Sequence, residues 1–189
     1  YDIIDTANAL RYKDVVKDVL MSALQTLQKT IADIARREAA TVQVGRTHGQ
    51  HAVPITFGFA MAGYVSRLEG SIASLQDLTA RLPGKFSGAV GAYNASSIFF
   101  DNPVAFEAEI LAVLGIRPGD HSTQIVQPEP LIRLFTEIML ACGVMANLAR
   151  DMRQLQRTEI GEVGEIFEAE QVGSSTMPQK RNPINFENV

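Results

Sequence analysis

Apolar residues recur at steps of three and four positions along the N-terminal part of the chain. Residues 3 to about 40 contain no glycine or proline, and one apolar stripe has helical spacing: Leu20, Leu24, Leu27, Ile31 and Ile34. This spacing places the side chains on one face of a helix. Arg36 and Arg37 follow the stripe, where the helix macrodipole is negative. The predicted helix exceeds the usual length of about 8–20 residues, which indicates a bundle.

The same spacing returns after two polar interruptions. One helix is predicted from residue 57 to about 82, with its stripe on Phe57, Met61, Tyr64, Leu68, Ile72 and Leu75. A second long helix is predicted for residues 128–157, and a short one for residues 103–114 with Asn102 as its cap and a proline at its first position. Another helix is predicted to start with Asn182 as its cap and Pro183 as its first helical residue. No alternation is long enough to demand a β-sheet, so the predicted fold class is all-α, a bundle of long helices.

Composition and charge narrow the class of protein. The chain has 189 residues, 46% of them hydrophobic and 20% charged, which is ordinary globular composition. Seventeen Lys and Arg against 21 Asp and Glu give a net charge of −4. Because phosphate neutralisation needs clustered basic charge, we expect neither a nucleic-acid partner nor a membrane partner.

Cysteine content and hydropathy indicate a reducing, cytoplasmic setting. Cys142 is the single cysteine, so the sequence excludes an internal disulfide and a cysteine-rich zinc site. Its apolar neighbours in residues 139–145 predict a buried, inert thiol. No stretch resembles a signal peptide, and the most apolar one, residues 131–148, is interrupted by Arg133 and Glu137.

The first polar interruption, Gly45-Arg-Thr-His-Gly-Gln50, is a candidate for acid–base chemistry. Glycines on either side of Thr47 and His48 let the backbone approach a ligand closely. An imidazole is the side chain best suited to proton transfer near neutral pH. The alternative is a loop histidine bonded to a nearby carbonyl group. We interpret His51, which an extended loop would point the other way, and His121 as structural.

Two further loops are rich in glycine. The loop at residues 85–91, Lys-Phe-Ser-Gly-Ala-Val-Gly, lacks the strand context of a nucleotide-binding fingerprint, so a tight helix crossing is the favoured interpretation. The loop Gly173-Ser-Ser-Thr-Met-Pro-Gln-Lys-Arg-Asn-Pro183 places hydroxyls, two cations and an amide just before a helix N-terminus. This arrangement suits a carboxylate or a phosphate, whereas the alternative is a solvated linker.

Residues 173–183 resemble the signature of the fumarase/aspartase superfamily, Gly-Ser-Ser-x-Met-Pro-x-Lys-x-Asn, and residues 45–50 resemble a second block of that superfamily. The blocks at residues 85–91 and 122–125, with a glycine after His48, look most like the adenylosuccinate lyase family. The resemblance implies the fumarase/aspartase type of bundle. It also implies that residues 1–189 are the central helical domain that forms the tetramer core, and that the N-terminal and C-terminal domains are absent from this chain.

The resemblance also implies a reaction and its residues. The family cleaves a C–N bond by β-elimination and releases fumarate. In this numbering the general base is Ser174, the general acid is His48, and Glu187 orients His48. The implied substrate contacts are Thr47, Gln124, Ser175, Lys180, Arg181, Asn182 and Asn188.

Family membership further implies the substrate and the assembly. The expected reaction converts adenylosuccinate to AMP and fumarate, and the related succinyl-carboxamide ribotide to its product, in purine biosynthesis. The expected assembly is a homotetramer whose active sites are shared between subunits. No cofactor and no metal are expected, and the isolated chain is expected to be inactive.

Two alternatives remain open from the sequence. The run at residues 50–56 is compatible with a 3-carboxy-cis,cis-muconate cycloisomerase, although His48 in place of an aromatic residue disfavours that branch. The chain could also be a non-catalytic helical assembly module. Four retained residues disfavour the module, because packing requires none of them: His48, Ser174, Lys180 and Glu187.

Overall fold

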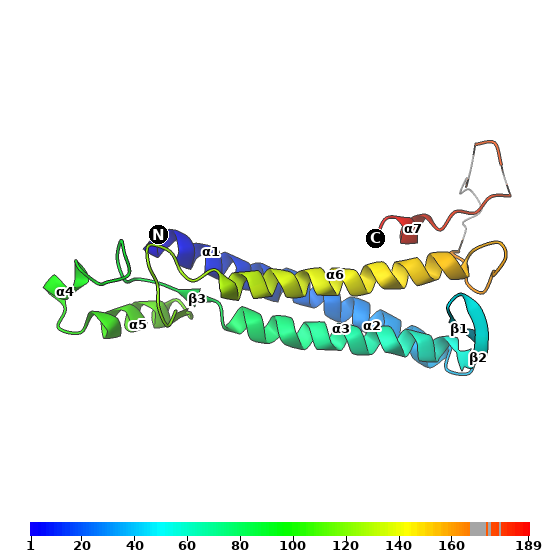
Figure 1. Cartoon of the computed structure of the whole chain (residues 1–189), viewed down its shortest axis with the longest axis horizontal. Coiled ribbons are helices and arrows are strands. Elements are labelled where there is room, and N and C mark those ends of the chain that lie inside the picture. Colours follow the sequence, from blue (N-terminus) through cyan, green and yellow to red (C-terminus); the bar gives the residue numbers. More distant parts are fainter. Residues whose placement is uncertain (167–172, 174, 178) are drawn as a thin grey trace. The chain divides into compact units, whose positions relative to one another are not determined.

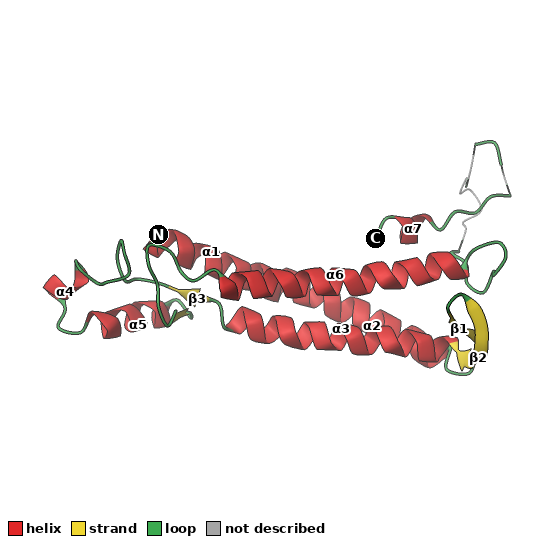
Figure 2. Cartoon of the chain, in the orientation of Figure 1, coloured by secondary structure: helices red, strands yellow, loops and turns green. Residues whose placement is uncertain are grey.

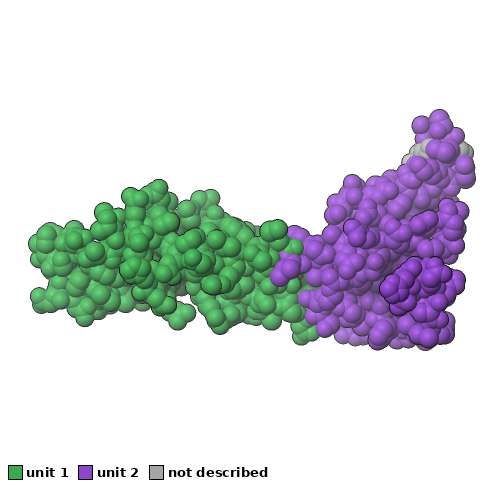
Figure 3. Space-filling model, in the orientation of Figure 1, with its two compact units in different colours: residues 1–30, 68–139 green, residues 31–67, 140–189 purple. Residues whose placement is uncertain are grey.

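The computed structural model describes residues 1–166, 173, 175–177 and 179–189, and most of them lie in helices (Figures 1 and 2). The chain divides into two compact units (Figure 3). Unit 1 contains residues 1–30 and 68–139, and unit 2 contains residues 31–67 and 140–189.

The predicted N-terminal helix is confirmed, with one irregularity. Helix α1 covers Asp2–Asp14, a π-helical segment η1 covers Val15–Leu20, and α2 covers Met21–Arg37. Leu24 and Ile31 of the apolar stripe are buried, as its spacing predicts. The η1 segment was not predicted, because it ends at Leu20, the first residue of the stripe, and the three-and-four spacing therefore lies almost wholly in α2.

The two long helices after it are also confirmed. Helix α3 covers Phe57–Ala80, and its buried apolar side chains are the predicted ones from the second residue of the stripe onward: Met61, Tyr64, Leu68, Ile72 and Leu75. Helix α6 covers Glu129–Leu155. By length and composition α6 could cross a membrane, and the core helices of soluble proteins meet the same criterion.

In unit 2, helix–helix packing combines close backbone approach with polar contacts. A Cβ on Gly58 of α3 would overlap backbone atoms of Ala35 and Ala39, so a glycine is required there. The Tyr64 hydroxyl donates to the Asp151 carboxylate of α6. Burial and this bond raise the pKa of the Tyr64 hydroxyl well above its ordinary value, which keeps the phenol protonated as the donor.

In unit 1, shorter elements follow α3. Strand β3 (Pro83–Gly84) pairs in parallel with β4 (Arg117–Pro118), α4 covers Ser96–Phe99, and α5 covers Pro103–Val113. The predicted cap is confirmed, because the Asn102 side chain accepts a hydrogen bond from the Ala105 N–H at 3.0 Å.

A β-hairpin replaces the loop predicted after α2. Strands β1 (Val42–Thr47) and β2 (Gln50–Thr56) pair antiparallel, with an irregularity between Val44 and Arg46. The alternation of apolar and polar residues did not predict the first strand, because the polar residue faces inward: Gln43 is buried, while Val42 and Val44 are exposed.

The prediction for Cys142 was wrong. Its side chain is exposed, although its neighbours Ala141 and Val144 in α6 are buried. Helix α6 packs against the chain along one face only, and Cys142 lies outside that face. An apolar sequence neighbourhood therefore did not mean burial within the chain.

Candidate active site

His48 lies at the tip of the β1–β2 hairpin. Thr47 pairs with Gln50, so His48 and Gly49 form a two-residue turn, and both have positive φ, 54° and 72°. Two-residue hairpin turns with positive φ at both positions favour Asn-Gly, and histidine is among the residues enriched in this region of backbone space. The turn exposes the imidazole and the side chain of Thr47 beside it. The hairpin thus exposes His48 at its tip, and a positive φ at a residue other than glycine motivates a hypothesis of function.

A charged contact fixes this hairpin to the segment after α6. The Arg46 guanidinium on β1 donates two hydrogen bonds to the Glu162 carboxylate, one of them at 3.1 Å, and the Gln43 amide donates a third at 3.2 Å. The bonds from Arg46 hold the pKa of Glu162 below its ordinary value, with a smaller contribution from the amide of Gln43 and from the charge of His51. The same pair raises the pKa of Arg46. A two-pronged pair of this type fixes orientation as well as distance.

The second candidate region is the end of the chain. Ser174, the predicted base, lies outside the described residues. Around it, the side chains of Ser175, Lys180 and Arg181 are exposed and Asn182 is half-buried. A turn forms here, in which the Lys180 N–H donates to the Met177 carbonyl at 2.9 Å.

One cavity of 640 Å³ is lined by residues of this segment and by two arginines near the end of α6: Lys180, Arg181, Asn182, Arg153 and Arg157. Four of these five side chains are cations. Glu165 also lines the cavity, and its carboxylate accepts hydrogen bonds from backbone N–H groups of the last helix. Within unit 2 this arrangement suits a ligand that carries carboxylate or phosphate groups.

Glu165 organises the last helix, α7 (Ile184–Glu187). Its carboxylate accepts from the Asn185 side-chain amide at 2.8 Å and from the Phe186 N–H at 3.2 Å. Helix α7 begins at Ile184. A carboxylate from an earlier segment accepts a backbone N–H of its first turn, in place of the predicted Asn182 cap.

Gln156 connects α6 to both sides of this arrangement. Its side chain accepts from the Glu165 N–H at 3.0 Å and donates to the Arg181 carbonyl at 3.4 Å. These bonds join the end of α6, the segment around residue 165 and the cationic segment around residue 181.

The structure groups the predicted site residues only in part. Among the described residues, no hydrogen bond or ion pair joins Glu187 to His48, and Asn188 is exposed beside Glu187. Gln124 belongs to unit 1, where it is exposed at the centre of a turn. In the part of the chain that is described, no three or more His, Cys, Asp or Glu side chains gather as a metal site.

Sequence reasoning missed Arg153, Arg157, Glu162 and Glu165. Arg153 lies in the last turn of α6 and Arg157 lies just beyond the end of that helix, and their spacing of four residues was a signal that the sequence contained. Glu162 and Glu165 accept hydrogen bonds from residues that are distant in the sequence, so no local pattern predicts their roles.

The architecture, the His48 hairpin and the cationic segment are those expected of a helical lyase. A family model described as lyase matches residues 1–189, and the chain belongs to this family. The resemblance to the fumarase/aspartase superfamily is thereby confirmed.

Within the family, the chain is 41% identical to the adenylosuccinate lyase of Pyrococcus abyssi, an alignment that covers 100% of this chain and 41% of the relative. Among solved structures, it is similar to the 3-carboxy-cis,cis-muconate lactonizing enzyme of Pseudomonas putida, with a TM-score of 0.83 and 33% identity over 98% of this chain and 41% of that chain.

The class II fumarase of Schistosoma mansoni shares the fold, with a TM-score of 0.76 and 22% identity over 98% of this chain and 43% of that chain. The chain therefore spans about two fifths of the length of the proteins that it matches.

Proposed function

We propose that the protein containing this chain is an adenylosuccinate lyase, which cleaves adenylosuccinate to AMP and fumarate. The observation that carries the proposal is the cationic cavity formed by Lys180, Arg181, Asn182, Arg153 and Arg157, in a chain similar to adenylosuccinate lyases along its whole length. Adenylosuccinate offers two carboxylates and a phosphate, so a cavity with four cations is chemically matched to it.

The proposed reaction is a β-elimination. Ser174 takes the proton next to a carboxylate, and the electrons left on carbon spread into that carboxylate. Lys180 stabilises the resulting dianion, because a fixed cation near developing charge lowers the barrier. The electron pair left on carbon then forms the C=C bond of fumarate as the C–N bond breaks. The C–N electron pair leaves with nitrogen, and His48 supplies the proton that nitrogen needs.

The remaining residues bind or orient. Glu187 orients His48, and we assign substrate contacts to Thr47, Gln124, Ser175, Arg181, Asn182 and Asn188. The hairpin supports the part given to His48, because its tip exposes the imidazole while Glu162 holds Arg46, two residues before His48. Among the described residues no hydrogen bond joins His48 to Glu187, and in the proposed assembly the two residues pair across a boundary between subunits.

We further propose a homotetramer with shared active sites, in which residues 1–189 are the central domain. Helix α6 supports this assembly, because large apolar side chains on it are exposed, with Ile132 at 57% and Met139 at 72%. Exposed apolar surface of this extent indicates a partner, and a second copy of the same helix offers the same apolar chemistry. The proposed setting is the cytoplasm, where the enzyme would also act on succinyl-carboxamide ribotide in purine biosynthesis.

An assay of the full-length protein with separate substrates tests the activity. Adenylosuccinate and 3-carboxy-cis,cis-muconate would be supplied in turn, and fumarate or lactone measured. We expect fumarate from adenylosuccinate and no lactone.

The alternative activity is muconate lactonization, which the similarity to the Pseudomonas putida enzyme favours. Lactone without fumarate would support that alternative. The absence of both products would support a helical assembly module without catalysis.

A further inference from the structure

Gln124 lies at the centre of a tight turn in unit 1. Ser122 and Val126 form an antiparallel bridge on either side of it, and the Thr123 N–H donates to the Ile125 carbonyl at 3.1 Å. The turn leaves Gln124 exposed at its tip. Its orientation therefore depends on whatever holds the two ends of the turn.

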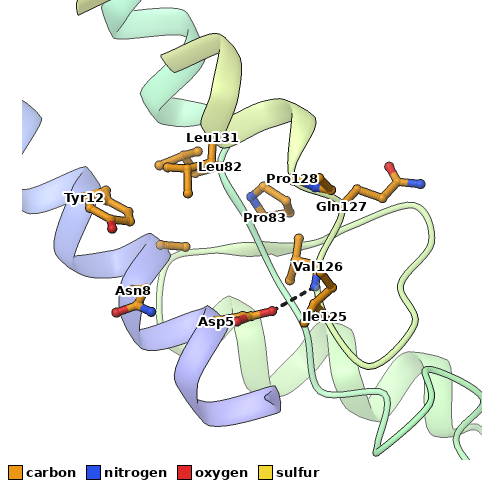
Figure 4. A pocket seen from close by; sticks show the side chains of 11 residues that line it. Asp5, Asn8, Tyr12, Leu82, Pro83, Ile125, Val126, Gln127, Pro128 and Leu131 are labelled. Atoms are coloured by element: carbon orange, nitrogen blue, oxygen red, sulfur yellow. Dashed lines mark hydrogen bonds between the residues drawn. The ribbon is translucent and has the colours of Figure 1, made fainter. Parts of the chain in front are cut away.

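One end is held by helix α1. The Asp5 carboxylate accepts a hydrogen bond from the Val126 N–H at 2.9 Å, across 121 residues of sequence (Figure 4). A hydrogen bond that involves a charged group is roughly twice as strong as one between neutral groups. Asp5 is thus a strong and specific support for this end.

The other end is held by the glycine-rich loop at residues 85–91. The hydroxyls of Ser87 and Ser122 lie 2.7 Å apart, and Ser87 is only 1% exposed. The same loop packs closely on the turn at Gly91, where a Cβ would overlap the Ser122 carbonyl and where φ is +77°. The helix crossing predicted for this loop is therefore replaced by a contact with the turn that carries Gln124.

A cavity makes these hydrogen bonds important. It has a volume of 210 Å³ and lies between α1 and residues 125–128, with Asn8, Tyr12 and Leu131 on its wall (Figure 4). Side-chain packing alone does not fill the space behind the turn, so the turn has room to shift when a support is removed.

We infer that Asp5 and Ser87 are positioning residues that hold the two ends of the turn at residues 122–126 and thereby orient Gln124 toward the substrate. The inference rests on the proposed function, in which Gln124 contacts adenylosuccinate. Neither residue touches the substrate in this scheme. Their loss weakens recognition because Gln124 samples unproductive orientations, which raises KM more than it lowers kcat.

The test uses the full-length protein and matched variants of α1. Asp5→Ala removes the acceptor, Asp5→Asn retains a neutral one, and Asn8→Ala alters the same cavity wall, where no hydrogen bond from Asn8 to the turn is seen among the described residues. We expect KM for adenylosuccinate to rise about tenfold in Asp5→Ala, the scale of one charge-assisted hydrogen bond. Asp5→Asn should recover most of the loss, and Asn8→Ala should leave KM unchanged.

Ser87→Ala tests the other support. We expect a KM rise of about threefold to tenfold, as for a neutral hydrogen bond, because Ser122 loses its partner. In the double variant Asp5→Ala/Ser87→Ala the effects should combine non-additively, since both residues hold one element.

Hydrogen exchange of the Val126 amide provides a readout that does not depend on activity. Exchange should accelerate in Asp5→Ala and not in Asn8→Ala. Equal KM values and equal exchange in these two variants would overturn the inference. Absence of adenylosuccinate cleavage by the wild-type protein would instead contradict the proposed function, while faster exchange in Asp5→Ala would still support the positioning of the turn.

Discussion

Loss of the Asp2 carboxylate should destabilise the protein strongly, because it leaves a buried cation behind. The Lys85 side chain is 1% exposed, and its ammonium donates to the Asp2 carboxylate and to the Gly88 carbonyl at 2.8 Å. The Asp2 side chain is 23% exposed and also accepts from the Gly88 N–H at 3.0 Å. The two partners of this pair therefore differ in their access to water.

This difference sets the expected magnitudes. Removing one partner of a buried pair costs about 3–5 kcal/mol, because the other charge stays buried without compensation. In Asp2→Ala the Gly88 carbonyl remains as an acceptor for Lys85, which places the expected loss near the lower end, at about 3 kcal/mol. In Lys85→Met the carboxylate keeps the Gly88 N–H and some water, so we expect about 1–2 kcal/mol.

Urea denaturation of the full-length protein, followed by circular dichroism at one fixed protomer concentration, measures both losses. Asp33→Ala is the matched control, because the Asp33–Arg36 pair is exposed on both sides and is worth at most about 1 kcal/mol. A loss in Asp2→Ala no larger than that in Asp33→Ala, or a larger loss in Lys85→Met than in Asp2→Ala, would refute the reasoning.

Three further predictions concern the hairpin, the cationic cavity and α6. The pKa of Glu162 is lowered in the folded state, so the Glu162 carboxylate stabilises the fold above its ordinary pKa of 4.5, and this stability is lost as the pH falls through the lower pKa of the folded state. In Glu162→Gln, denaturation measured against pH should not show this loss of stability at acid pH. A pH profile equal to that of the wild-type protein would contradict the pairing with Arg46. Lys180→Ala should raise KM and lower kcat together, because its charge meets the substrate before and during the reaction, and steady-state kinetics showing a change in KM alone would limit Lys180 to binding. Cys142 should react slowly with a thiol reagent in the native assembly and rapidly after dissociation, whereas fast labelling of the intact protein would exclude α6 as the interface at that position.

The helices could be predicted from the sequence because their signal is local. The spacing of Leu24 and Ile31, or of Leu68 and Leu75, reflects burial along one continuous segment. Asn102 could likewise be recognised as a cap, since its acceptor serves an N–H only three residues away.

The missed features depend on residues that are distant in sequence. Gln43 is buried in a strand because Glu162 accepts from its amide across 119 residues, and this inverted the hairpin pattern. The Glu165 carboxylate accepts hydrogen bonds from α7 across 20 residues of sequence. Nothing in the sequence near Asn182 therefore showed that a different residue would take the place of the predicted cap. Motifs could place His48, Lys180 and their neighbours on two segments, but only the fold shows Arg153 and Arg157 on the wall of the same cavity.

Direct detection of both products tests the central claim most sharply. Proton NMR of full-length protein mixed with adenylosuccinate would follow the fumarate and AMP signals over time, with Ser174→Ala as the matched variant. We predict equimolar fumarate and AMP from the wild-type protein, and a rate about 10²–10⁴ times lower in Ser174→Ala, the contribution of one general base. No fumarate from the wild-type protein would contradict the proposed activity, and an unchanged rate in Ser174→Ala would contradict the assignment of the base.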